Sequence, residues 1–98
     1  MTTPQERLEN YSRSRPREVL RLTVRDSEGE GEILVYKGFT SSLSRATAFD
    51  PDVPVLEPDT EILWVDRIQA PYQPQSIQYL EQHLSWVEFS QRLEQAGF

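Results

Sequence analysis

The sequence predicts an α+β domain: a small antiparallel sheet of three to four strands, with a short N-terminal helix and two C-terminal helices packed on it. Three observations lead to this prediction. Residues 18–25 alternate apolar and polar side chains, which is typical of a half-buried strand. Residues 33–36 and 60–68 are apolar runs of strand length. Residues 85–93 begin with a capping box and continue with apolar residues at helical spacing.

The chain of 98 residues predicts a single domain. We expect residues 1–16 to form a helical appendage and an arginine-rich linker. Residues 17–69 should form the sheet, with a long loop over 37–59. Residues 70–98 should form a helical pair.

The first helix should begin at Thr3, which can cap it, with Pro4 in the first helical position and Glu6 completing a capping box. Leu8 and Tyr11 give it only a thin apolar stripe, so this helix must dock or fray.

Within the predicted sheet, Leu20, Leu22 and Val24 share one face of the first strand. Residues 26–31 form a polar turn. The runs 33–36 and 60–68 are apolar on both faces, so we expect them to pair in the middle of the sheet.

The C-terminal part of the chain predicts two helices. The first should run from Ser76 to Leu84, with a buried stripe that includes Leu80. The second should begin at Ser85, with Trp86 among its buried side chains. The other predicted members of the two buried stripes are Ile77, Phe89 and Leu93.

Residues 37–54 form the longest stretch with neither helix nor strand periodicity, yet they contain two phenylalanines, two basic residues and several hydroxyls. Long ordered connections in small domains are frequently functional. We therefore predict a partner-binding surface here. Its candidate residues are Lys37, Phe39, Ser41, Leu43 and Arg45.

The net charge of −6 is unevenly distributed: residues 1–45 carry +1 and residues 46–98 carry −7. The acidic total disfavours general binding to nucleic acid or to anionic membranes. The arginine-rich N-terminal half nevertheless offers an alternative, an anion or nucleic-acid contact. Its candidate residues are Arg13, Arg15, Arg17, Arg21 and Arg25. The opposite interpretation is that these arginines are solvated or pair with acidic residues of the second half.

Several classes of function are disfavoured. The chain has no cysteine, which excludes disulfides and thiolate metal sites. It has no apolar run long enough to span a membrane and no apolar signal segment at its N-terminus, so we expect a soluble cytoplasmic protein without membrane insertion. Asp50 and Asp52 lack the remainder of a calcium-loop pattern, and His83 is the single histidine, so we expect no metal and no cofactor.

An enzyme would need acid–base groups held together in a pocket. Asp50, Asp52, Asp66, Arg67 and His83 are the only plausible set. The sequence context gives each a structural role instead, with Asp66 and Arg67 as an ion pair, and we predict no catalytic residues.

The chain also resembles a small uncharacterised family of cyanobacteria that occurs in plants as a plastid-targeted domain. The resemblance rests on residues 35–43 and 46–56, on Asp66-Arg67, on Pro71-Tyr72 followed by Pro74, and on residues 84–89. It covers residues 17–93 and treats the first helix as a variable appendage. The family is a domain of unknown function, so the resemblance implies no activity, only a cytoplasmic or stromal setting near photosynthetic machinery. The small size of the chain, its acidity, the absence of cofactor motifs and the aromatic loop favour a non-catalytic interaction module, an assembly or regulatory factor of a larger complex.

Overall fold

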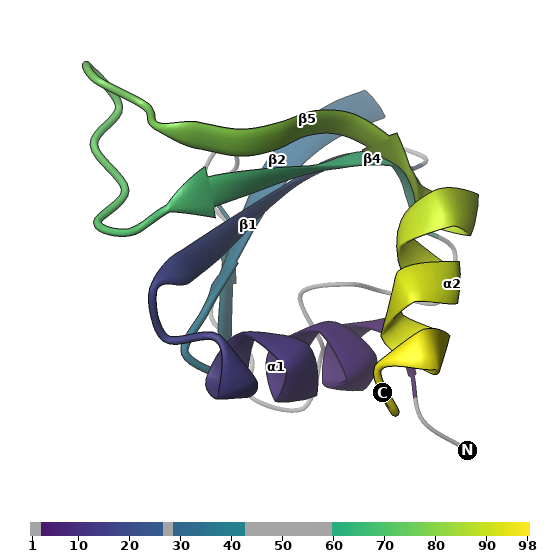
Figure 1. The fold of residues 1–98 in the computed structure, drawn as a ribbon. Helices are drawn as coiled ribbons and strands as arrows, with labels where there is room; N and C mark the ends of the chain where they lie inside the picture. Colours follow the sequence, from purple (N-terminus) through teal and green to yellow (C-terminus); the bar gives the residue numbers. More distant parts are fainter. Residues whose placement is uncertain (1–2, 27–28, 43–59) are drawn as a thin grey trace.

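A single antiparallel sheet carries both helices on one of its faces (Figure 1). The structure, a computed structural model, describes residues 3–26, 29–42 and 60–98. The described elements are α1 (Pro4–Ser14), β1 (Glu18–Asp26), β2 (Gly29–Tyr36), β3 (Phe39–Ser42), β4 (Glu61–Gln69), β5 (Tyr79–Ser85) and α2 (Trp86–Gln95). The five described strands lie in the order β3-β2-β1-β4-β5. The α+β class is confirmed, but the sheet has more strands and the C-terminal part fewer helices than the sequence predicted.

The central strand is β1, which pairs with β2 on one side and β4 on the other. The predicted pairing of the two apolar strands was therefore wrong. Leu20 of β1 faces Val35 of β2 and Arg67 of β4, and its neighbours Leu22 and Val24 also point into the core. Because the described helices cover only one face of the sheet, a strand with one polar face can occupy the centre.

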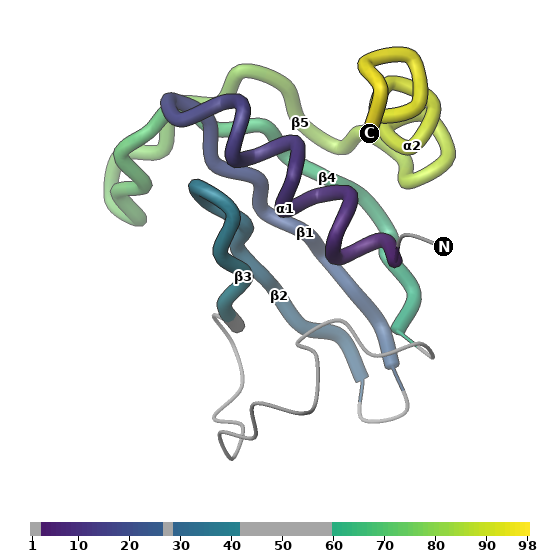
Figure 2. The backbone as a smooth tube through the Cα atoms, turned by 90° about the horizontal axis from the view of Figure 1, so that it is seen from below, coloured from purple at the N-terminus to yellow at the C-terminus, as the bar shows by residue number. Residues whose placement is uncertain are grey.

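Helix α1 lies across the sheet and belongs to the core (Figure 2). Thr3 caps its N-terminus, and Leu8 and Tyr11 are buried. The Tyr11 ring contacts the rings of Phe89 and Phe98 edge to face, at centroid distances of 5.5 and 5.9 Å. The expected appendage thus contributes two side chains to the hydrophobic core cluster.

The strand β5 occupies the segment 76–84, for which the sequence predicted a helix. That prediction was wrong for a physical reason. Leu84 packs inward opposite Val65, whereas Leu80 is exposed, so the expected helical stripe does not exist. Two register shifts between β4 and β5, and a positive φ of 55° at His83, interrupt the alternation that would have revealed a strand.

The first residues of the predicted long loop 37–59 form a tight turn followed by a strand. Lys37 and Gly38 form a two-residue turn with φ angles of 50° and 84°, the combination favoured in tight β-hairpins. Strand β3 then pairs with β2, with Tyr36 opposite Phe39. The short edge strand expected at 46–49 lies outside the described residues.

The helix predicted from Ser85 is confirmed. The Ser85 hydroxyl accepts the amide hydrogen of Glu88 at 3.1 Å, and α2 begins at Trp86. Phe89 and Leu93 are fully buried, while Trp86 is only partly buried against the core.

Candidate functional site

The β2–β3 turn is fixed against α1 by side chains of that helix. The Gly38 amide donates to the Ser12 hydroxyl at 2.9 Å, and the Thr40 hydroxyl donates to the Glu9 carboxylate at 2.7 Å. The Arg13 guanidinium lies so close to Gly38 that an added Cβ would approach its Nε atom to 2.9 Å. The turn therefore has one defined position relative to the helix.

We expect Ser12→Ala to lower the free energy of unfolding by about 1–2 kcal/mol, because the Gly38 amide would lose its acceptor at a site where Ser12 is 1% exposed. Urea denaturation followed by circular dichroism measures this. Ser90→Ala is the matched control, since the Ser90 hydroxyl donates only to a carbonyl of its own helix. Equal losses in the two variants would contradict the anchoring role of Ser12.

This anchored turn presents an aromatic side chain to solvent. Phe39 is 78% exposed, the largest value among the exposed large hydrophobic residues of the described chain. Thr40 points to the helix side, so the alternation of β3 places Phe39 and Ser41 on the opposite face. Of the five predicted partner-binding residues, Lys37, Phe39 and Ser41 lie together at this hairpin. Leu43 and Arg45 are outside the described residues.

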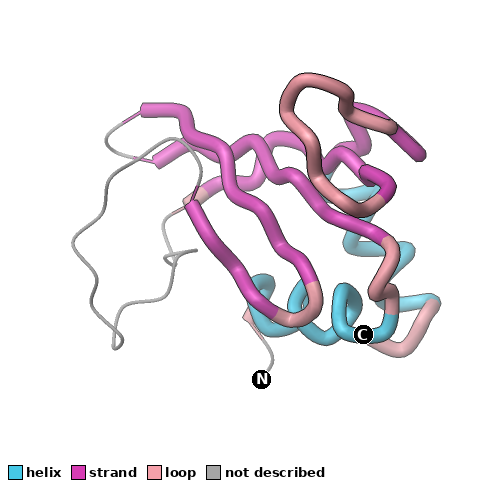
Figure 3. The backbone as a smooth tube through the Cα atoms, turned by 90° about the vertical axis from the view of Figure 1, so that its left-hand side faces the viewer, coloured by secondary structure: helices cyan, strands magenta, loops and turns pink. Residues whose placement is uncertain are grey.

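Three of the five predicted anion-contact arginines lie at the end of the sheet that carries this turn. Arg13 contacts Gly38, and Arg15 caps the C-terminus of α1. Arg17 lies in the connection between α1 and β1, where its carbonyl accepts the Ala70 amide hydrogen at 2.8 Å. Figure 3 faces this end of the molecule, which carries the α1–β1 connection, the β2–β3 turn and the β4–β5 connection. We call Arg13, Arg15, Arg17 and Lys37 the basic end.

The side chains of the basic end have no carboxylate partner among the described residues. The Arg13 guanidinium donates to the Asn10 side-chain carbonyl, Arg15 lies 5.2 Å from the centroid of the Tyr11 ring, and the Lys37 ammonium lies 5.3 Å from that of Tyr36. The third connection at this end, residues 70–78, contains no acidic residue. Within the described part of the chain, this end therefore carries positive charge without a carboxylate partner, although the net charge of the whole protein is −6.

The other two arginines are elsewhere and are neutralised. Arg21 pairs with Asp66 at 3.2 Å and donates to the Tyr79 hydroxyl at 2.7 Å. Arg25 pairs with Glu30 at 3.3 Å on the exposed surface. The predicted cluster of five arginines thus divides into two groups. Three have no carboxylate partner among the described residues, and two pair with acidic residues.

Comparison with known proteins assigns the chain to a protein family. A model for a domain of unknown function, DUF7734, matches residues 5–93. The chain belongs to the DUF7734 family. No match was found among curated proteins or among solved structures.

The DUF7734 match agrees with the resemblance to an uncharacterised family and extends further toward the N-terminus. It begins within α1, whereas the resemblance began at residue 17. The matched region includes the whole basic end and most of α2. A family of unknown function assigns no role to any residue, so the function of the DUF7734 fold must be inferred from its geometry.

Of the acid–base set considered from the sequence, the structure of this DUF7734 domain describes Asp66, Arg67 and His83. Asp66 and Arg67 are not an ion pair, because neighbouring strand residues point to opposite faces. Asp66 lies on the face away from the helices, where it pairs with Arg21 and accepts the His83 amide hydrogen at 2.8 Å. Asp50 and Asp52 are outside the described residues. Within residues 3–26, 29–42 and 60–98, no group of three or more acidic or histidine side chains could hold a metal ion.

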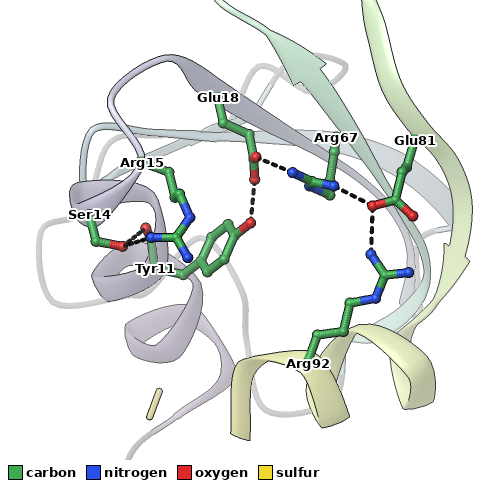
Figure 4. Close-up of polar contacts among 7 residues, drawn as sticks. All are labelled: Tyr11, Ser14, Arg15, Glu18, Arg67, Glu81 and Arg92. Atoms are coloured by element: carbon green, nitrogen blue, oxygen red, sulfur yellow. Dashed lines mark hydrogen bonds and ion pairs between the residues drawn. The ribbon is translucent and has the colours of Figure 1, made fainter. Parts of the chain in front are cut away.

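Arg67 instead joins a polar network on the helix side (Figure 4). It donates to Glu18 at 2.7 Å and to Glu81, and Glu18 also accepts the Tyr11 hydroxyl at 2.6 Å. Arg92 of α2 reaches the same Glu81 oxygen at 2.5 Å. The network therefore connects both helices with β1, β4 and β5, a connection that sequence patterns alone could not reveal.

The charges of this network stabilise one another. The hydrogen bond from Arg92 lowers the pKa of Glu81 and outweighs its partial burial, and Arg67 adds to this effect. Burial raises the pKa of the Tyr11 phenol, and the Glu18 carboxylate raises it further. Every named charge has an opposite partner, which fits a structural role. As a further finding, no helix of the described chain is long and apolar enough to cross a membrane.

Proposed function

We propose that this DUF7734 domain is a non-catalytic protein-interaction module, and that the β2–β3 hairpin is its contact surface. The proposal rests on the exposure of Phe39, whose side chain is 78% exposed on a hairpin that Ser12 and Glu9 of α1 hold in place. An aromatic side chain presented on a fixed support loses little conformational entropy on binding, and aromatic residues are frequent energetic centres of interfaces. Lys37 and Ser41 flank this anchor with polar groups.

The proposal extends to the setting implied by the sequence resemblance. We propose an assembly or regulatory factor of a larger complex in the cytoplasm or the plastid stroma, with a role near photosynthetic machinery. Asp66 and Arg67, two of the residues considered for catalysis, lie in separate ion-pair networks, which supports a non-catalytic role.

Native co-purification of a tagged chain from its source cells, after nuclease treatment, tests the module. We expect Phe39→Ala to remove a stoichiometric protein partner while changing the free energy of unfolding by less than about 1 kcal/mol, because the side chain is mostly solvated. Val87→Ala is the control, since Val87 is 67% exposed on α2. A partner that is retained by the Phe39→Ala chain would contradict the proposal.

The second candidate function is nucleic-acid binding. Its supporting observation is the basic end, where Arg13, Arg15 and Arg17 have no described acidic partner. The neutralised Arg21 and Arg25, together with the net charge, weaken it. Recovery of nucleic acid that disappears after nuclease treatment would favour this candidate.

A further inference from the structure

The exposed Phe39 directly follows the β2–β3 turn at the basic end. Lys37 and Phe39 are separated only by Gly38, whose position beside Arg13 is fixed by the Ser12 hydrogen bond. Arg17 lies in the α1–β1 connection at the same end of the sheet, where its carbonyl accepts the Ala70 amide hydrogen at 2.8 Å. An exposed aromatic side chain therefore lies next to a turn at the basic end, whose side chains have no carboxylate partner among the described residues.

The chemistry of this surface specifies a complementary ligand. Guanidinium groups recognise carboxylates and phosphates through paired hydrogen bonds, and an exposed phenylalanine requires an apolar contact. The remaining described arginines are already committed: Arg21, Arg25, Arg67 and Arg92 pair with carboxylates, and Arg7 donates to the backbone carbonyls of Ser90 and Phe98. Among the described residues, arginine and lysine side chains without a carboxylate or carbonyl of another element as partner are consequently concentrated at the basic end.

We infer that the basic end binds an acidic peptide segment of a partner protein, in which aspartate or glutamate residues lie next to an aromatic or aliphatic residue that contacts Phe39. This inference rests on the proposed function and names the chemical class of its partner. A short peptide can touch the basic end alone. A nucleic-acid strand carries a regular row of phosphates, and its repulsion from a protein of net charge −6 extends beyond the local patch.

The test uses the full chain and a displayed library of random peptides, followed by affinity measurements on the selected peptides. We expect the selected peptides to combine acidic with aromatic or aliphatic residues, and their affinity to fall as salt rises. Arg17→Glu and Lys37→Glu should each weaken their binding about tenfold or more, because a repulsive charge replaces an attractive one. Arg25→Glu is the control for net charge, and it should change the affinity less than about threefold.

The other outcomes would overturn the inference. The inference of an acidic partner would be contradicted by selected peptides without acidic residues or by an empty selection. It would also be contradicted if the Arg17→Glu and Lys37→Glu chains bound the peptides as well as the wild-type chain does. Tighter binding of a single-stranded oligothymidine, lost in the same two variants, would assign the basic end to nucleic acid. These results are distinguishable from failure of the proposed module, which depends on whether a co-purifying protein requires Phe39.

Discussion

Arg67→Met is expected to lower the free energy of unfolding by about 3 kcal/mol. The substitution keeps the aliphatic stem but removes the guanidinium that pairs with Glu18, whose side chain is only 7% exposed. A buried carboxylate without its cation is costly, and the Tyr11 hydroxyl alone cannot neutralise it. Chemical denaturation of the variant and the wild-type chain at neutral pH measures the difference.

The chain offers a matched control for this prediction. Arg25→Met removes an arginine from the same sheet, but the pair of Arg25 with Glu30 is 55% and 60% exposed, and we expect a change of less than about 0.5 kcal/mol. Adding Glu18→Gln to Arg67→Met should recover part of the lost stability, since the unpaired buried charge is then absent. A similar small effect of Arg67→Met and Arg25→Met would show that the network is not a structural connection.

The local signals in the sequence predicted the elements whose formation depends on local chemistry. The alternation of Leu20, Leu22 and Val24 located β1, and the capping box at Ser85 located the start of α2, because both patterns act within a few residues. Local sequence patterns did not predict the structure of the segment 76–84. Its bulged pairing with β4 determines its structure, and the spacing of Leu80 and Leu84 matched a helix only by coincidence.

The candidate site was only partly predictable for the same reason. Lys37, Phe39 and Ser41 could be selected from the sequence because they lie close together in one unusual segment. Joining Arg13 and Arg17 to Lys37 requires the order and direction of the strands, which bring three separate connections to one end of the sheet. One usable signal was present: residues 15–17, 37–38 and 70–78 contain no acidic residue in an otherwise acidic chain.

The second large effect that we expect concerns the stability of the fold and α1, the helix that the resemblance treated as variable. We expect Leu8→Ala to lower the free energy of unfolding by about 3 kcal/mol, because Leu8 is fully buried and its truncation leaves a cavity between α1 and the sheet. Thermal and urea denaturation, followed by the circular dichroism of the whole domain, measure this loss. A single cooperative transition in both chains would show that α1 unfolds together with the sheet.

Leu80→Ala is the matched control for Leu8→Ala, because it makes the same chemical change at a leucine that is 47% exposed on β5. We expect it to cost less than about 1 kcal/mol, since little surface is buried there and no cavity forms. If the two leucine variants were equally stable, α1 would not belong to the core. The anchoring of the β2–β3 turn by Ser12 and Glu9 would then lose its support, and with it the fixed presentation of Phe39 on which the proposed function depends.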